Sequence, residues 1–147
     1  MSAETFEDVV ETFSYLDDWE DRYRYVIDLG KAMPEMDDGL KSPLTKVDGC
    51  VSQVWIAPQL EGEGDDAVLR FAGDSDAMIV RGLIAVLQIM LSGKSASTIL
   101  ETDITGALAS IGLDQHLSAQ RSNGLKAMVQ RLQDLAKAAS KQTSTMT

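Results

Sequence analysis

Cysteine is almost absent from this sequence, since Cys50 is the only one among 147 residues. A single thiol cannot form an intramolecular disulfide or a Cys-x-x-Cys redox pair, so we expect a free thiol in a reducing compartment. The chain also has a single histidine, His116. One cysteine and one histidine are too few for a structural zinc site or a Cys-ligated iron–sulfur cluster, which need about four ligands. The sequence therefore predicts no bound metal.

Positive charge is also in short supply. Lys and Arg number 13 against 23 Asp and Glu, which gives a formal net charge of −10. Nucleic acids and anionic membrane surfaces bind clustered positive charge, so neither is an expected partner. A protein with a basic patch is a better match, because complementary fields speed the encounter of two proteins.

Motifs for binding nucleotides are missing as well. The chain has no GxxxxGK[ST] loop and no GxGxxG fingerprint, and its "EGEG" stretch is too acidic to hold phosphate. The acidic pairs do not follow EF-hand spacing and are explained by caps, turns and solvated faces. We expect no cofactor to be bound by this chain.

Long hydrophobic runs are absent too. The most apolar window, "AMIVRGLIAVLQIML", is interrupted by Arg81 and Gln88 and stops at Ser92. It is shorter than the roughly 20 apolar residues of a membrane span, so we predict a core helix. The first residues, "MSAETFEDVVETF", have neither the pattern of a signal peptide nor that of a transit peptide, which predicts a cytoplasmic protein.

What the sequence does contain is a regular succession of helical and strand-like patterns. Apolar residues at helical spacing predict helices over about 6–16, 17–30, 76–91, 96–101, 106–111 and 119–139. Alternating patterns predict short strands over 46–49, 52–59 and 67–73, after a loop over 33–44. The candidate N-caps are Thr5, Asp17, Asp74 or Ser75, Ser95, Thr105 and Ser118, and Gly30 and Gly112 are candidate helix ends.

This order predicts an α+β fold. Three consecutive short strands form a three-stranded antiparallel sheet, and several helices pack on one face of it. In the second strand, Gln53 and Trp55 are expected on one side of the sheet and Val54 and Ile56 on the other. Residues 1–140 form a single domain, and the polar residues 141–147 are predicted to be a disordered tail.

Cys50 lies between the first two predicted strands, directly after Gly49. A glycine-bearing turn leaves room for another molecule to approach, and a partly exposed thiol that becomes a thiolate is reactive. The opposing interpretation is a small apolar side chain buried in the core. The sequence pattern alone leaves both open.

Two other side chains are candidates for supporting a reactive Cys50. His116, in "LDQHLS", could activate the thiol as in a thiol hydrolase or transferase, with Asp114 or Asn123 orienting its ring, or could have only a local structural role. Arg121 stands in the first turn of the last predicted helix, where the helix dipole disfavours a cation. A guanidinium held there could attract a thiolate or a carboxylate of a partner, although a solvated arginine is an equally good explanation.

Four segments resemble the SufE family, which includes CsdE. In "GCVSQVWI", the residues Gly49, Cys50, Ser52, Val54 and Trp55 match its Gly-Cys-x-Ser-x-Val-Trp signature. The stretches "WEDRYRYVIDLGKAMP", "GDSDAMIVRGLIAVL" and "QHLSAQRSNGLKAMV" are similar to the family in the same order, so the likeness spans about residues 6–139. The resemblance implies an α+β fold related to the IscU cluster scaffolds.

The resemblance also implies a function. SufE-like proteins accept persulfide sulfur from a cysteine desulfurase of the SufS or CsdA type, whose cofactor is PLP, and they stimulate that enzyme. The acceptor here would be Cys50, and the sulfur would go to iron–sulfur scaffold proteins. By similarity, Gly49, Ser52, His116 and Arg121 would support the loop or the docking of the partner. The chain lacks the three cysteines of a scaffold, so it is expected to carry sulfur without building clusters.

Overall fold

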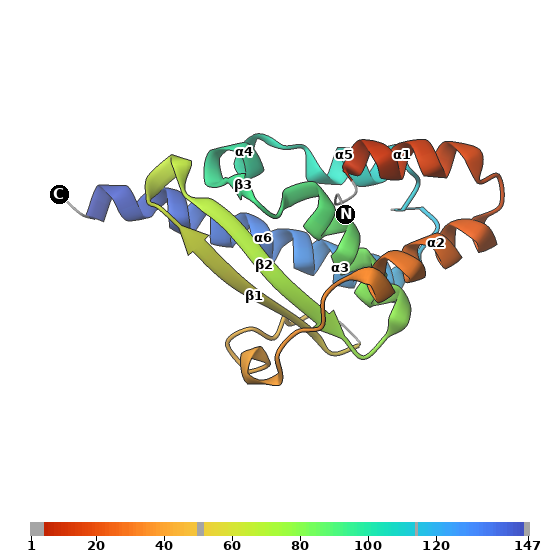
Figure 1. The fold of residues 1–147 in the computed structure, drawn as a ribbon, viewed down its shortest axis with the longest axis horizontal. Coiled ribbons are helices and arrows are strands. Elements are labelled where there is room, and N and C mark those ends of the chain that lie inside the picture. Colours follow the sequence, from red (N-terminus) through yellow and green to blue (C-terminus); the bar gives the residue numbers. More distant parts are fainter. Residues whose placement is uncertain (1–4, 50–51, 114, 146–147) are drawn as a thin grey trace.

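The computed structural model describes residues 5–49, 52–113 and 115–145 (Figure 1). Its helices and strands, in chain order, are α1 (Phe6–Tyr15), α2 (Trp19–Ala32), the 3₁₀ turn η1 (Asp38–Leu40), β1 (Val54–Glu61), the 3₁₀ turn η2 (Gly64–Asp66), β2 (Val68–Ser75), α3 (Met78–Leu91), β3 (Lys94–Ser95), α4 (Ala96–Glu101), α5 (Ile104–Ser110) and α6 (Ala119–Thr145). None of the helices among these residues combines the length and the apolar character that a membrane span requires.

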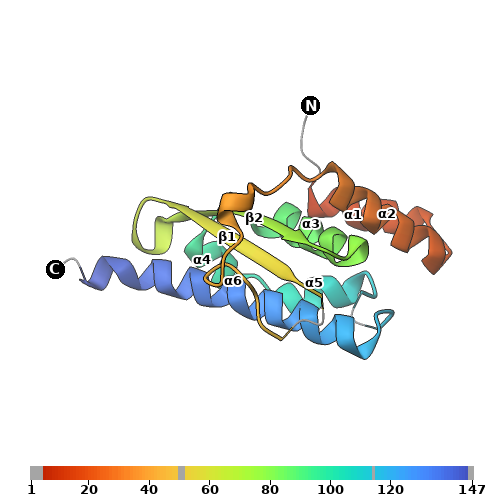
Figure 2. The ribbon, with the colours of Figure 1, turned by 90° about the horizontal axis from the view of Figure 1, so that it is seen from below.

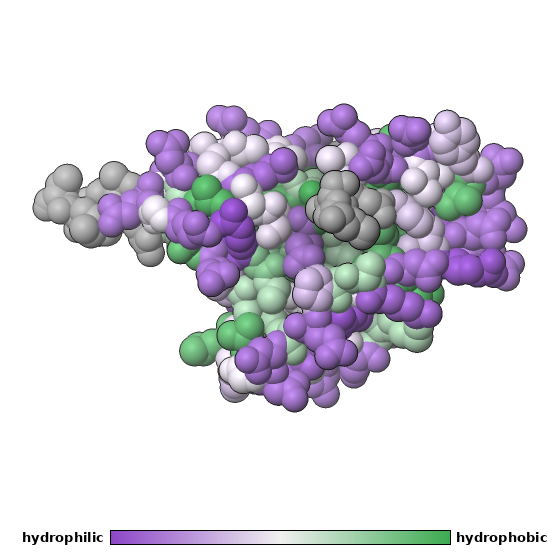
Figure 3. Space-filling view, viewed as in Figure 1, coloured by the Kyte–Doolittle hydropathy of each residue, from purple (hydrophilic) through white to green (hydrophobic). Residues whose placement is uncertain are grey.

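The strands form one antiparallel sheet in the order β1-β2-β3, with α3 and α6 behind it in the view of Figure 1. This confirms the predicted α+β class. Val54 and Ile56 are fully buried, whereas Trp55 is half-buried and Gln53 exposed, so the predicted faces of β1 are also confirmed. Hydrophilic residues cover much of the surface in Figure 3, and paler green residues gather where the sheet lies in Figure 1.

One of the three predicted strands is wrong, whereas the other two correspond to β1 and β2. Residues 46–49 do not form a strand, since only Lys46 makes a bridge, to Trp55. The third strand is instead β3, which pairs with Val68 and Leu69 of β2. A strand of two residues has no alternation to recognise, and backbone hydrogen bonds to β2 fix its place. The N–H of Gly93 donates to the Leu69 carbonyl at 2.8 Å, just before the strand.

The two ends of α2 differ from the prediction. Gly30 does not end α2, which continues to Ala32; it lies inside the helix, against Gly82 of α3. A Cβ at Gly30 would stand 2.7 Å from the Gly82 nitrogen, so this glycine permits close packing of two helices. The N-cap of α2 is Asp18 and not Asp17, because the Asp18 carboxylate accepts from the N–H of Glu20 at 3.1 Å.

The helix ends follow the local sequence with some exceptions. Caps at Thr5, Ser95 and Ser118 are confirmed, and Gly112 follows α5 with φ +78°. The cap of α5 is Asp103 and not Thr105, and α3 begins at Met78 without a side-chain cap. Helix α6 continues to Thr145, into the segment for which disorder was predicted, because no glycine or proline stops it there.

Candidate functional site

Cys50 and its neighbour Val51 lie outside the described residues. The residues that precede and follow them in the chain are described, and they define the candidate site. The preceding residues form a narrow hairpin with the start of β1. The N–H of Val47 donates to the Val54 carbonyl, and the N–H of Ile56 donates to the Thr45 carbonyl, both at 2.8 Å. Gly49, at φ +91°, has the left-handed backbone that glycine adopts without strain. The hairpin therefore places the ends of the segment 48–53 close together.

The first arm of this hairpin is attached to α6. Arg131 donates from Nη1 to the Leu44 carbonyl at 3.3 Å and from Nη2 to the Lys46 carbonyl at 2.5 Å. Gly49 also lies near this helix, because a Cβ there would contact Cβ of Ala127 at 3.4 Å. Figure 2 shows residues 41–49 crossing over α6. No sequence signal indicated Arg131, which resembles any arginine on the polar face of a helix.

The segment after residue 51 is attached to the start of α3. The N–H of Gln53 donates to Oδ1 of Asp76 at 3.0 Å, and the N–H of Asp76 donates to the Gln53 carbonyl at 3.3 Å. This reciprocal pair connects Gln53 to the residues just before α3. The chain is thus attached to α6 before residue 50 and to α3 after residue 51.

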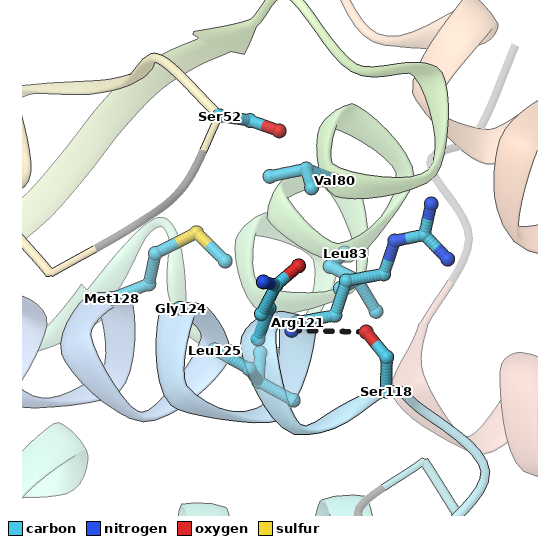
Figure 4. A pocket seen from close by; sticks show the side chains of 9 residues that line it. Ser52, Val80, Leu83, Ser118, Arg121, Gly124, Leu125 and Met128 are labelled. Carbon is cyan, nitrogen blue, oxygen red and sulfur yellow. Dashed lines mark hydrogen bonds between the residues drawn. The ribbon is translucent and has the colours of Figure 1, made fainter.

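A cavity of about 290 Å³ opens beside Ser52, between α3 and α6 (Figure 4). Its polar lining consists of Ser52, Ser118, Gln120 and Arg121, and its apolar lining of Val80, Leu83, Leu125 and Met128, with Gly124 between them. The structure therefore brings two of the predicted site residues, Ser52 and Arg121, to one cavity, with Gly49 near the same helix.

Arg121 lines both this cavity and a second one. Its backbone N–H donates to Oγ of Ser118 at 3.3 Å, and its side chain extends from α6 toward α3 in Figure 4. The second cavity, about 400 Å³, is lined by Arg121 together with Tyr23, Ile27, Ala77, Met78 and Ile79. The side chain of Arg121 is exposed, so a cation faces solvent at the cavity that Ser52 also lines.

His116 is placed elsewhere. Its ring stacks on Trp19 with centroids 3.9 Å apart and an interplanar angle of 16°. It lines a different cavity, together with Phe13, Arg22 and residues of α5. Asp114, a candidate to orient this imidazole, lies outside the described residues. Ser52 and His116 thus line two different cavities.

A charged network on the outer face of the sheet was not foreseen from the sequence. Asp74, predicted as a cap, accepts from Arg81 and from Nζ of Lys41, the latter at 2.9 Å. Arg81 also donates to the carbonyls of Gly30 at 2.8 Å and Met33 at 3.1 Å, at the end of α2. The network connects α2, α3 and β2 with the loop that precedes the Cys50 hairpin.

The pKa values of the network reflect these contacts. Burial by itself would raise the pKa of Asp74, but hydrogen bonds from Lys41, the Ser75 backbone and Arg81 outweigh it and leave that pKa below its ordinary value. The hydrogen bond to Asp74 raises the pKa of Lys41 against the opposing effect of burial. Lys41 also lies 5.1 Å from the centre of the Trp55 ring, as a cation–π contact.

Metal ligation has no candidate within the described residues, where no group of three or more His, Cys, Asp or Glu side chains is placed to hold an ion. The polar groups at the cavity beside Ser52 are hydroxyls, an amide and a guanidinium. Such a set favours an anionic or polar guest over a metal.

Comparison with known proteins identifies the family. The family model of SufE, described as an Fe-S metabolism associated domain, matches residues 7–136. The chain belongs to the SufE family. An uncharacterized SufE-like protein of Rhizobium etli is 48% identical over 133 residues, which cover 90% of each chain. Another from Rhizobium meliloti is 46% identical over 132 residues, which cover 90% of this chain and 94% of the relative.

The fold is also found in a solved structure. The solution structure of a hypothetical protein from Thermus thermophilus has a TM-score of 0.72 and is 23% identical, covering 95% of this chain and 98% of the other. That likeness concerns the fold alone. Membership of the SufE family associates the chain with iron–sulfur metabolism.

Proposed function

We propose that this chain is a sulfur acceptor and carrier, in which Cys50 takes persulfide sulfur from a cysteine desulfurase and delivers it for iron–sulfur cluster assembly. The observation that carries the proposal is the position of Cys50. The only cysteine of the chain falls in the Gly-Cys-x-Ser-x-Val-Trp stretch of a chain that belongs to the SufE family. A family associated with iron–sulfur metabolism needs a supply of sulfur, and a single thiol is sufficient to carry it.

The proposed step is a thiol–persulfide exchange. The Cys50 thiolate attacks the terminal sulfur of the donor's cysteine persulfide, a new S–S bond forms, and the donor's S–S bond breaks. The donor cysteine leaves as a thiolate, the transferred sulfur keeps its proton, and Cys50 becomes a persulfide. No external oxidant or reductant is consumed, because the sulfane sulfur moves at constant oxidation level.

The surroundings of residues 50–51 support this chemistry. A nucleophilic thiol has to be a thiolate, and a nearby cation favours the charged form. Arg121 supplies a guanidinium at the cavity that Ser52 lines. Gly49 and Ser52 bracket Cys50 in the sequence, and both lie by described elements that hold the hairpin. Docking of a partner on residues that are already held in place costs little ordering entropy.

The expected partners follow from the same proposal. The donor is a SufS- or CsdA-like cysteine desulfurase, which brings PLP and is stimulated when its persulfide is removed; the recipient is an iron–sulfur scaffold protein. The net charge of −10 suits partners with basic patches. The cytoplasm, where free thiols remain reduced, is the expected location.

The alternative, a thiol hydrolase or transferase using Cys50 with His116, gains no support. Such an enzyme needs the imidazole within hydrogen-bond reach of the thiol. His116 stacks on Trp19 and lines a cavity with residues of α1, α2 and α5, whereas Ser52 lines the cavity between α3 and α6.

Intact mass spectrometry tests the proposal directly. The protein is incubated with a SufS- or CsdA-like desulfurase, PLP and cysteine, and then analysed without reductant. We expect the mass to rise by one sulfur atom, the added sulfur to be lost with a thiol reductant, and no addition in Cys50→Ser. Omitting cysteine is the control for sulfur carried over from purification.

The contrary results are equally clear. If the desulfurase turns over and the wild-type mass does not change, the protein is not an acceptor of this sulfur. An acyl adduct trapped on Cys50 by an activated ester, and lost in His116→Ala, would favour the hydrolase instead.

A further inference from the structure

We propose that Trp19 and His116 act as a stacked pair that positions the first turn of α6, and with it Arg121, for the sulfur transfer proposed above. The inference rests on that proposed function, and it gives His116 a role other than proton transfer. Both are positioning residues, because neither lines the cavity beside Ser52.

The contact between the two rings is close and nearly parallel. The centroids are 3.9 Å apart and the planes differ by 16°. His116 is an exposed side chain, whereas Trp19 is half-buried. An exposed ring buries little apolar surface in the core. The main effect of the stack is therefore to fix the position of the His116 backbone relative to Trp19.

The turn before α6 is built on the same tryptophan. A Cβ at Gly112 would stand 2.8 Å from Cζ2 of Trp19, so only a glycine lets the turn lie this close, and its φ of +78° also requires one. The N–H groups of Gln115 and His116 both donate to the Gly112 carbonyl, at 3.2 and 3.3 Å. Gly112 and His116 thus both lie against Trp19.

Trp19 is itself held in place by neighbouring residues. It is the first residue of α2, and Arg22 covers its ring at 5.0 Å while donating to the carbonyls of Leu16 and Phe13 at 2.6 and 3.0 Å. Helix α2 packs against α3 through the glycine contact described above. Because Trp19 is held by this helix pair, its ring fixes the position of Gly112 and His116, which lie against it.

A short path leads from the stack to Arg121. Ser118 follows His116 by two residues and caps the helix by accepting from the N–H of Arg121 at 3.3 Å. On the other side, Tyr23 lies one helical turn after Trp19, with ring centroids 5.6 Å apart, and lines the second cavity together with Arg121. Helix α2 therefore contacts the start of α6 in two places: Trp19 stacks on His116, and Tyr23 lines a cavity together with Arg121.

The test compares variants of the stack with variants of Arg121 in the desulfurase assay. His116→Ala removes the ring, His116→Phe keeps a flat ring, and Gln115→Ala removes an exposed neighbour in the same turn as the matched control. We expect His116→Ala to raise the acceptor concentration for half-maximal persulfidation of Cys50 by about three- to tenfold with little change in the maximal rate. His116→Phe and Gln115→Ala should remain within about twofold of wild type on the same scale.

A double variant tests whether His116 acts through Arg121. If it does, His116→Ala combined with Arg121→Ala should be no worse than Arg121→Ala alone. Losses that multiply, or a His116→Ala variant equal to wild type, would overturn the inference while leaving wild-type sulfur uptake, and so the proposed function, intact.

Amide hydrogen exchange provides a readout that does not depend on sulfur. In His116→Ala the N–H groups of Arg121 and Ser122 should exchange about tenfold faster, and in His116→Phe they should not. Unchanged exchange in His116→Ala contradicts the positioning role. If wild type takes up no sulfur at all, the proposed function fails by its own experiment, and this exchange still decides whether the stack orders α6.

Discussion

Helices α2 and α3 meet backbone against backbone at Gly30 and Gly82, whereas residues 44–49 and 52–53 are held on α6 and α3 by a few polar contacts. In the first region, a methyl group added at either glycine would overlap main-chain atoms. In the second, two carbonyls accept from Arg131 and one carboxylate accepts from the backbone of Gln53.

The two regions differ in the kind of contact that holds them. Close packing of main chains fixes the distance between two helices, because a core transmits any misfit to its neighbours. Hydrogen bonds from partly exposed side chains contribute about 1 kcal/mol each and open at low cost. Residues 44–49 and 52–53 are thus attached by the weaker kind of contact, whereas α2 and α3, packed by the stronger kind, form the frame that supports them.

Gly82→Ala should disrupt the packing of α2 against α3 and have the largest effect on stability. The new Cβ would overlap the carbonyl of Val26, and the gain in helix propensity, about 1 kcal/mol, is smaller than the strain. We expect the free energy of unfolding to fall by about 3 kcal/mol in urea denaturation. Gly39→Ala is the control, since its Cβ would make only an ordinary contact with Asp37; an equal loss there would contradict the argument.

Arg81→Met should come next. The substitution keeps much of the aliphatic stem but removes the donors to Gly30, Met33 and Asp74. The expected loss is about 2 kcal/mol in the same denaturation measurement, because three partly buried acceptors lose a charged donor. A variant as stable as wild type would show that the network is incidental to the α2–α3 frame.

The contribution of Asp74 should depend on pH. Its pKa lies below the ordinary 3.8 in the folded protein, so its carboxylate stabilises the fold above that pH, and the stabilisation is lost as the pH falls through the folded pKa. We expect Asp74→Asn to be less stable than wild type by about 1.5 kcal/mol near pH 7. The gap should close progressively below about pH 4; a gap that widens in acid would contradict the assigned direction.

Arg131→Met should loosen the second region with the smallest effect on global stability. We expect a loss below about 1 kcal/mol, together with faster exchange of the Val47 amide, which donates to Val54 in the hairpin. Lys137→Met, at an exposed position further along α6, is the matched control. Unchanged exchange at Val47 in Arg131→Met would mean that β1 holds the hairpin without α6.

Periodicity in the sequence was sufficient to predict most of the helices and both longer strands. The apolar spacing of α3 and the alternation in β1 correspond to faces that are buried in the structure. Caps at Thr5, Ser95 and Ser118 are local hydrogen bonds within four residues, and such signals are present in the sequence itself. The prediction failed where a partner distant in the chain decides: β3 exists only beside β2, and Gly30 has its role only beside Gly82.

The candidate site divides in the same way. The residue types at Gly49, Cys50 and Ser52 are sufficient to indicate the family and the chemistry, because these residues lie within four positions of one another in the chain. The placement of Arg121 at the cavity beside Ser52, and of His116 on Trp19, depends on how α6 crosses α3 and approaches α2.

The sequence by itself determined the class of fold, the helical and strand periods, and the single thiol, since each is a property of near neighbours or of composition. Only the tertiary structure decided which helix holds residues 44–49, which helix holds Gln53, and which cation lines the cavity beside Ser52. It also decided why Asp74 is an ion-pair partner and not a cap. Contacts between residues far apart in the chain decide these points, because the free energy of each depends on a geometry that no single segment contains.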